Sequence, residues 1–263
     1  MNGEIVNLIE LVSDLKVTLN GQTNQIELNK NINKIDFYIK KKEKKIKNFF
    51  KKSDDTYENI ASSVLKWKEY LIDKGMEKAS LVMGLPAEQD INLAGFTNGN
   101  NQWVILTYHK EFCMVWLKRW SFLDDIKKWD VAYYGIELKQ QIAENNYFIN
   151  DNLLEVEYAL KEISSFAFKI KENFWGEYFD RALAIINNKK NSTYISLPES
   201  YPQENKVLLS AISTGWCFGA MGSWNDSPPY SAHSLDLDDE YNEVSSKLYT
   251  AFLNGLEAAV NAY

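Results

Sequence analysis

The sequence predicts an α+β protein that is predominantly helical, with a small antiparallel sheet of three to four strands in the middle of the chain. Near both ends, apolar residues recur at three- and four-residue steps, which is the spacing of one helix face. Between them lie short runs rich in β-branched and aromatic residues, which favour strands. The 263 residues, 45% of them hydrophobic, are enough for a large core. We expect a single composite domain over residues 1–263, with a division into a helical part, 1–80, and an α+β part, 81–263, as the alternative.

The first two elements are expected to be helices. Residues 4–19 carry an apolar stripe that ends at an Asn-Gly pair, a typical helix stop. Residues 24–52 place isoleucines at steps of three, four and seven, which favours a long helix with a lysine-rich C-terminal end. Apolar residues also alternate between positions 35 and 39, as they would in a strand. The helix is the prediction here, and the strand is its alternative.

A third helix and then the sheet are expected to follow. Ser53 and the two aspartates after it resemble an N-cap, and Gly75 is a candidate helix terminator, so a helix is predicted over residues 53–75. The Asn-Gly-Asn-Asn run at 98–101 indicates a turn between two strands. The predicted strands are residues 90–97, 102–108, 112–117 and 130–138.

The C-terminal half is expected to be helical. Its clearest pattern is the last one, in which apolar side chains recur every four residues from Val244 to Val260. Acidic residues precede this stripe, and prolines interrupt the chain before it. The predicted helices are residues 151–174, 176–187, 204–214 and 239–261.

Residues 215–226 form the most distinctive stretch of the chain, with three glycines and two tryptophans in twelve residues. Glycine permits close backbone approach and positive φ angles, and tryptophan supplies a large rigid contact area. Such a stretch is either a tightly packed turn or a binding surface. For Trp224, Asn225 and Asp226, one reading is a turn anchored by a buried tryptophan. The other is an exposed tryptophan beside an acid, which is typical of an interface hot spot.

Composition restricts the classes of partner. The net charge of −7 argues against a nucleic-acid-binding protein and is compatible with a basic protein partner, because opposite fields accelerate encounter. The two cysteines are far apart, which excludes a disulfide framework and is typical of a reducing compartment. The first residues lack a signal-peptide pattern, and no run of 18 apolar residues occurs. We therefore expect a cytoplasmic protein with neither a membrane nor a nucleic-acid partner.

Reactive and metal-binding patterns are weak in this sequence. His109 and Cys113 lie four residues apart, and Cys217 and His233 could meet them in the fold as zinc ligands, but the first pair falls in a predicted hairpin. Cys217, with glycines on both sides, could act as a nucleophile, yet no family signature surrounds it. The glycine spacing after position 215 differs from the dinucleotide-binding fingerprint. No metal, cofactor or catalytic residue is therefore assigned.

Two charged runs admit a structural and a functional interpretation. The acids Asp236, Asp238, Asp239 and Glu240 precede the last predicted helix, where N-capping and the helix dipole favour them. Their alternative role is an acidic contact surface. The lysine run within 40–52 is interpreted as a solvated helix end rather than as a phosphate-binding patch.

The string from Trp216 to Asp226 resembles a family of bacterial proteins. Small acidic cytoplasmic proteins carry a similar Trp-x-Phe-Gly-(Gly/Ala)-Met-Gly-Ser-Trp-Asn-Asp string before a final amphipathic helix, and here it occupies positions 216–226. The group resembled is that of the immunity proteins of polymorphic toxin systems, which bind a cognate toxin and block it. The resemblance covers only the C-terminal part of the chain. It implies an inhibitor that forms a stable complex with a toxin, and it transfers no individual site residue.

The acidic balance adds the expectation that the toxin is basic. The partner-binding residues that we expect from the chemistry of the chain are Trp224, Asn225, Asp226, Asp236, Asp238, Asp239 and Glu240. Two alternatives stay open. One is a hydrolase with an unfamiliar active site near Cys217, His233 and the acids at 236–240, and the other is a scaffold or carbohydrate-binding module that uses exposed aromatic rings.

Overall fold

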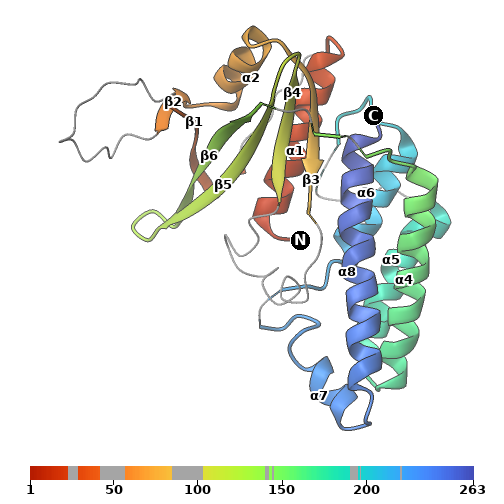
Figure 1. Ribbon diagram of the computed structural model, residues 1–263. Coiled ribbons are helices and arrows are strands. Elements are labelled where there is room, and N and C mark those ends of the chain that lie inside the picture. Colours follow the sequence, from red (N-terminus) through yellow and green to blue (C-terminus); the bar gives the residue numbers. More distant parts are fainter. Residues whose placement is uncertain are drawn as a thin grey trace.

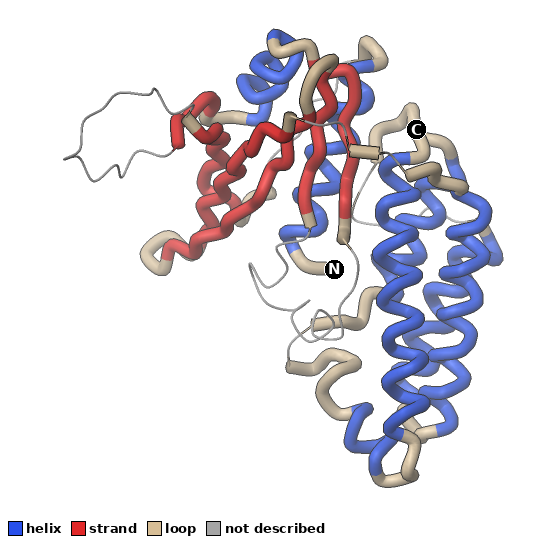
Figure 2. The backbone as a smooth tube through the Cα atoms, in the orientation of Figure 1, coloured by secondary structure: helices blue, strands red, loops and turns tan. Residues whose placement is uncertain are grey.

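The computed structural model describes residues 1–22, 29–41, 57–84, 103–139, 142–143, 145–189, 195, 197–219 and 221–263. Within them, the helices are α1 (Gly3–Leu19), α2 (Val64–Asp73), α4 (Ile149–Lys169), α5 (Asn173–Asn188), α6 (Gln203–Gly215), α7 (Pro228–His233) and α8 (Asp238–Asn261). The strands are β1 (Ile32–Lys40), β2 (Tyr57–Ala61), β3 (Met76–Val82), β4 (Val104–His109), β5 (Cys113–Leu123) and β6 (Lys128–Leu138). Strands and long helices are segregated: a sheet with α1 and α2 lies beside a bundle of α4, α5, α6 and α8 (Figures 1 and 2).

The sheet is larger than the sequence predicts. Six strands are paired in the order β2-β1-β6-β5-β4-β3. Strands β3 to β6 form an antiparallel meander, whereas β1 runs parallel to β6 and antiparallel to β2. The prediction of a small antiparallel sheet of three to four strands in mid-chain is therefore wrong, because three strands that precede the predicted region, β1, β2 and β3, join the sheet and β1 pairs in parallel. The predicted hairpin at 102–117 and the strand at 130–138 are confirmed, while the predicted strand at 90–97 and its turn lie outside the described residues.

The helix predicted over residues 24–52 is wrong where it is described, because residues 32–40 form β1. Its central residues Ile35 and Phe37 are 1% and 0% exposed and face the core that lies under α1 and α2. The alternation of apolar residues between positions 35 and 39, which indicates a strand, is thus the pattern that matches the structure. The parallel pairing with β6 supplies the hydrogen bonds that a lone strand would lack. Residues 42–52, with most of the lysine run, lie outside the described residues.

The helix predicted over residues 53–75 is half correct. Strand β2 occupies residues 57–61, and α2 begins only after Ser63, whose Oγ accepts a hydrogen bond from the Lys66 N–H at 3.3 Å. The predicted cap at Ser53 lies outside the described residues. Gly75 follows the helix with φ of 71°, so its expected role as a terminator is confirmed.

Helix α1 packs against the sheet with polar as well as apolar side chains. Its predicted stripe is buried except at Leu19, which is partly buried, and residues on the flanks of that stripe are buried too, so the helix is buried nearly all round. Buried polar groups need partners, and here the sheet and α2 supply them. The pairs are Glu4 with Lys118 at 3.6 Å, Asn7 Oδ1 with the Tyr133 hydroxyl at 2.8 Å, and Asp14 with Lys68 at 2.8 Å.

The sheet and the bundle are joined at strand β3. The Asn261 side chain of α8 donates from Nδ2 to the Leu81 carbonyl at 2.8 Å and accepts from the Leu81 N–H at 2.9 Å. Just beyond the end of the strand, the Glu257 carboxylate accepts from the Met83 N–H at 2.6 Å. One helix thus supplies the hydrogen bonds that a neighbouring strand would otherwise make with this edge.

The four long helices of the bundle match the predicted C-terminal helices, with one shifted boundary. All five apolar residues of the predicted stripe in α8, from Val244 to Val260, are buried. Helix α4 ends at Lys169 rather than at 174, because Lys171 adopts a left-handed φ of 65° that stops the helix. Gly255 permits close packing, since a Cβ there would lie 2.6 Å from Ile212 Cδ1 and 3.2 Å from Val156 Cγ2.

Candidate functional site

The tryptophans of the glycine-rich stretch lie in the core of the bundle. Trp224 is 0% exposed, and its Nε1 donates to Ser245 Oγ at 2.8 Å. Its ring is stacked on Tyr241 and meets Trp175 and Phe179 edge-on, with ring centroids 5.3–5.7 Å apart. A buried ring cannot contact a partner, so Trp224 acts as the anchor of a turn rather than as a contact residue.

Hydrogen bonds close the turn around this anchor. The Trp224 N–H donates to the Cys217 carbonyl at 3.0 Å, and the Tyr241 hydroxyl donates to the Trp224 carbonyl at 3.0 Å. At the outer end, the Gly222 N–H donates to Asp226 Oδ2 at 2.9 Å, and Gly222 has φ of 79°, which glycine adopts without strain. The distinctive string therefore encodes a compact turn that fixes α8 against α5.

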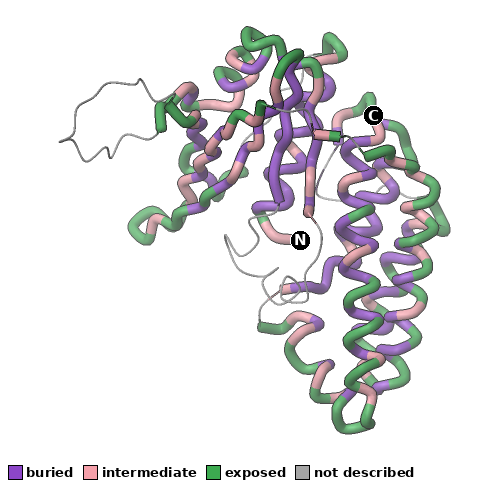
Figure 3. The backbone as a smooth tube through the Cα atoms, in the orientation of Figure 1, coloured by how far each residue is buried: buried purple, intermediate pink, exposed green. Residues whose placement is uncertain are grey.

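Residues 221–240, called the acidic segment here, run from this turn through α7 to the first turn of α8. Three of its apolar side chains project into solvent: Met221 is 94% exposed, Tyr230 78% and Leu235 42%. The segment around α7 is largely exposed (Figure 3). Five carboxylates accompany these side chains, and the segment has no lysine or arginine: Asp226, Asp236, Asp238, Asp239 and Glu240.

The acids at the start of α8 interact favourably with the helix dipole, but none of them caps the helix with a side-chain hydrogen bond. The residue that precedes the helix is Leu237, and no side chain caps it, so the N-capping interpretation is wrong. Asp238, Asp239 and Glu240 occupy the first turn, where negative charge is favourable. Glu240 pairs with Lys169 of α4, and both Asp238 carboxylate oxygens lie 3.1 Å from His233 Nδ1.

Of the predicted contact residues, the structure therefore keeps most at the surface. Asp226, Asp236, Asp238 and Asp239 are exposed, and Asn225 and Glu240 are partly exposed. They lie along one continuous stretch, whereas Trp224 lies beneath it. The exposed apolar residues of the acidic segment are not among the predicted contacts, because an irregular segment has no periodicity that would show which side chains face solvent.

The cysteines and histidines do not form a common site. His109 lies between the Lys74 carbonyl, 3.1 Å from Nδ1, and Thr107 Oγ1, 3.3 Å from Nε2, while Cys113 is buried in a separate apolar cluster on the other face of the sheet. Burial raises the pKa of the Cys217 thiol well above its usual value, which disfavours the reactive thiolate. His233 is exposed on α7 and is paired with Asp238. Among the described residues, no group of three or more His, Cys, Asp or Glu side chains is placed to hold a metal ion.

Glu10 on α1 is a titratable group that the sequence patterns do not single out. It is half-buried, its buried Oε2 has no hydrogen-bond partner among the described residues, and burial raises its pKa to about 7. The folded chain holds this proton more tightly than the unfolded chain does, so protonation of Glu10 stabilises the fold. This stabilisation is fully present below about pH 4.3 and is lost as the pH rises to about 7. Allowing for solvent screening, we expect the free energy of unfolding of wild type to fall by about 2 kcal/mol more than that of Glu10→Gln over this pH range.

Urea denaturation of both proteins at pH 4.5, 5.5, 6.5 and 7.5 measures this difference. Because the Gln variant keeps every other titratable group, subtracting its stability from that of wild type isolates the contribution of Glu10. Parallel stability curves for the two proteins would show that the Glu10 carboxyl titrates normally.

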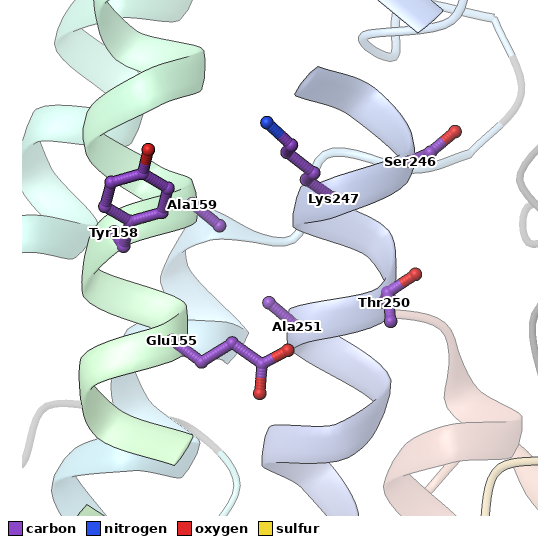
Figure 4. Close-up of a pocket in the computed structure, with 7 residues that line it drawn as sticks. All are labelled: Glu155, Tyr158, Ala159, Ser246, Lys247, Thr250 and Ala251. Carbon is purple, nitrogen blue, oxygen red and sulfur yellow. The ribbon is translucent and has the colours of Figure 1, made fainter. Parts of the chain in front are cut away.

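The described residues line a groove on the bundle and a cavity at the sheet. A groove of about 440 Å³ lies between α4 and α8, where Tyr158 faces Lys247 and Glu155 extends toward Ala251 (Figure 4). A more enclosed cavity of about 380 Å³ lies at the end of the sheet beneath the C-terminal turn of α2. Neither hollow includes a residue of the acidic segment.

Comparison with protein-family models, with curated proteins and with solved structures gives no match to this chain. Within the described residues, no helix combines the length and the apolar character that crossing a membrane requires.

Proposed function

We propose that this protein is a cytoplasmic immunity protein, an inhibitor that neutralises a basic bacterial toxin by forming a stable complex through its acidic segment. The observation that carries the proposal is the combination of exposed apolar side chains and a local excess of carboxylates in one continuous stretch. Between Lys206 and Lys247 the chain has six carboxylates and no lysine or arginine. The resemblance of the string at 216–226 to immunity proteins supports the same function.

The side chains of this stretch suit protein recognition. Tyrosine and methionine are enriched at the centres of protein interfaces, and Tyr230 and Met221 are the most exposed large apolar side chains of the segment. Carboxylates around such a centre attract a basic partner and exclude acidic ones. Because the buried turn fixes the start of α8, the segment is presented on a rigid support, which reduces the entropy lost on binding.

The partner is best identified by affinity capture from the native host, with wild type and charge variants compared as bait. We expect wild type to retain one basic protein in a 1:1 complex, and we expect co-expression of wild type to rescue cells from that protein. Retention of no basic protein, or of one whose expression leaves cell growth unchanged, would contradict the proposal.

Neutralising three acids should slow association with that partner. For Asp236→Asn/Asp238→Asn/Asp239→Asn, we expect an association rate constant about tenfold lower at low salt and a weaker dependence on salt, because long-range attraction sets the encounter rate. Surface plasmon resonance at two ionic strengths measures both quantities. The control Asp73→Asn/Asp124→Asn/Asp125→Asn makes the same change in net charge at exposed positions on α2 and the β5–β6 hairpin. Equal slowing by both triple variants would show that net charge acts and the acidic segment does not.

Removing the exposed ring should act on dissociation instead. Tyr230→Ala is expected to weaken the complex by about 2 kcal/mol, chiefly through faster dissociation. Its matched control is Tyr158→Ala on α4, which truncates a similarly exposed tyrosine, 61% against 78%, outside the acidic segment. An unchanged dissociation rate for Tyr230→Ala would exclude the acidic segment as the centre of the interface.

A further inference from the structure

The cavity beneath the end of α2 lies beside a glycine of β6, Gly135. On the face of the sheet that α2 covers, one cross-strand row contains Glu58, Ile39, Gly135 and Trp116, each opposite the next in the strand register. Gly135 contributes no side chain to this row, and the ends of the Met114 and Trp116 side chains pack against it. A Cβ at Gly135 would lie 2.9 Å from both Met114 Cε and Trp116 Cζ3, so no larger residue fits without displacing the floor.

Aromatic and apolar side chains form part of the wall of this cavity. Tyr70 and Lys74 line it from the C-terminal turn of α2, with the Lys74 ammonium 5.6 Å from the centre of the Tyr70 ring. Phe112 forms another wall and is stacked on His109 at 4.4 Å, and His109 in turn is bonded to the Lys74 carbonyl. His109 thus links the Phe112 ring to the backbone at the end of α2. A cavity of about 380 Å³ is in the size range of small-molecule sites.

The polar groups that line it carry both signs of charge. Lys40, Lys41 and Lys74 contribute three ammonium groups, and none of them forms an ion pair with a described carboxylate. Glu58 and Glu137 contribute two carboxylates. Burial and these two carboxylates raise the pKa of Tyr70, so its hydroxyl stays protonated and available as a donor. The ammonium groups suit an anion, and the carboxylates suit hydrogen-bond donors on the same molecule.

We propose that this cavity is a binding site for a small molecule that combines a flat aromatic ring, bearing hydrogen-bond donors, with an anionic group, which is the chemistry of a mononucleotide. The ring lies between Ile39, Met114 and the Tyr70 ring, with Gly135 at the edge of the site. Its donors face Glu58 and Glu137, and the anionic group meets Lys74 with Lys40 or Lys41. This site is independent of the acidic segment and of the inhibitor function proposed above.

Three probes separate the contributions to binding: AMP, which has the ring and the charge; adenosine, which has the ring alone; and inorganic phosphate, which has the charge alone. Calorimetry gives the affinities, and the NMR shift of the Gly135 amide locates the site. We expect AMP to bind and to shift this amide, and we expect adenosine and phosphate to bind at least tenfold more weakly. Absence of a shift with millimolar AMP, or equal binding of AMP and adenosine, would overturn the proposal.

Two variants and a control test the assignment. Lys74→Gln is expected to weaken AMP binding at least fivefold and to leave adenosine binding unchanged, and Gly135→Ala is expected to abolish both. Lys66→Gln removes an exposed lysine from the same helix and should change neither. If Gly135→Ala does not fold, Lys74→Gln alone decides the matter. Equal losses in Lys74→Gln and Lys66→Gln would show unspecific charge attraction and overturn the site.

Discussion

Replacing Trp224 with alanine is expected to lower the free energy of unfolding by about 3–5 kcal/mol, which is the usual cost of truncating a fully buried aromatic side chain. The ring is 0% exposed and contacts aromatic side chains of α5 and α8. Truncation would leave a cavity between these helices and would leave Ser245 Oγ without its donor. Guanidinium denaturation followed by circular dichroism measures the loss.

Two further variants separate packing from the hydrogen bond and from surface contact. Trp224→Phe keeps most of the ring volume and removes the bond to Ser245, so we expect a loss of about 1–2 kcal/mol. Met221→Ala, three residues earlier and 94% exposed, should change stability by less than about 0.5 kcal/mol. If Trp224→Ala is no less stable than Met221→Ala, the ring is not the anchor of the turn.

Replacing Asn261 with alanine is expected to cost about 2–4 kcal/mol. The Asn261 side chain satisfies both the N–H and the carbonyl of Leu81 on the edge of β3, and these bonds are buried. Alanine would leave two backbone groups without partners in a place that water does not reach easily, and each such group costs about 1–3 kcal/mol. Urea denaturation with an independent probe in each part of the chain measures the loss and shows whether the sheet and the bundle still unfold together.

Asn254 on the same helix supplies the control. Its side chain is exposed and reaches only Glu155, 3.3 Å away, so Asn254→Ala should change stability by less than about 0.5 kcal/mol. Asn261→Asp keeps the acceptor and loses the donor, so we expect an intermediate stability that rises as the carboxyl is protonated. Equal stability of the two alanine variants would mean that the strand edge does not depend on this side chain.

The sequence predicts the long helices well and the sheet poorly, for reasons that particular residues show. In α8, five apolar residues recur at four consecutive four-residue steps, so burial of one face determines the element. In β1, the same isoleucines fit both a helical and a strand period, and what decides between them is pairing with β6, about a hundred residues further along the chain. Such a contact leaves no trace in local periodicity.

For the candidate site, the sequence locates the segment and misjudges one of its residues. Asp236, Asp238 and Asp239 are at the surface as expected, because charged side chains seldom lose their water without a partner. Trp224 is different, since a tryptophan in a turn can be a buried anchor or an exposed contact residue. The contacts that bury it come from Ser245 and Tyr241 on α8, and the local sequence of the turn does not show them. The cavity at Gly135 depends on cross-strand neighbours and on α2, so the sequence of β6 alone does not indicate it.

The bond between Asn261 and Leu81 spans 180 residues of sequence. On a ribosome, β3 is made well before the part of α8 that completes its edge, because 180 residues separate them. Until then the nascent chain carries an open strand edge, which is the form most prone to pair with another copy or with a chaperone. The final residues of α8 therefore decide when this protein, as it is synthesised, stops being vulnerable to aggregation.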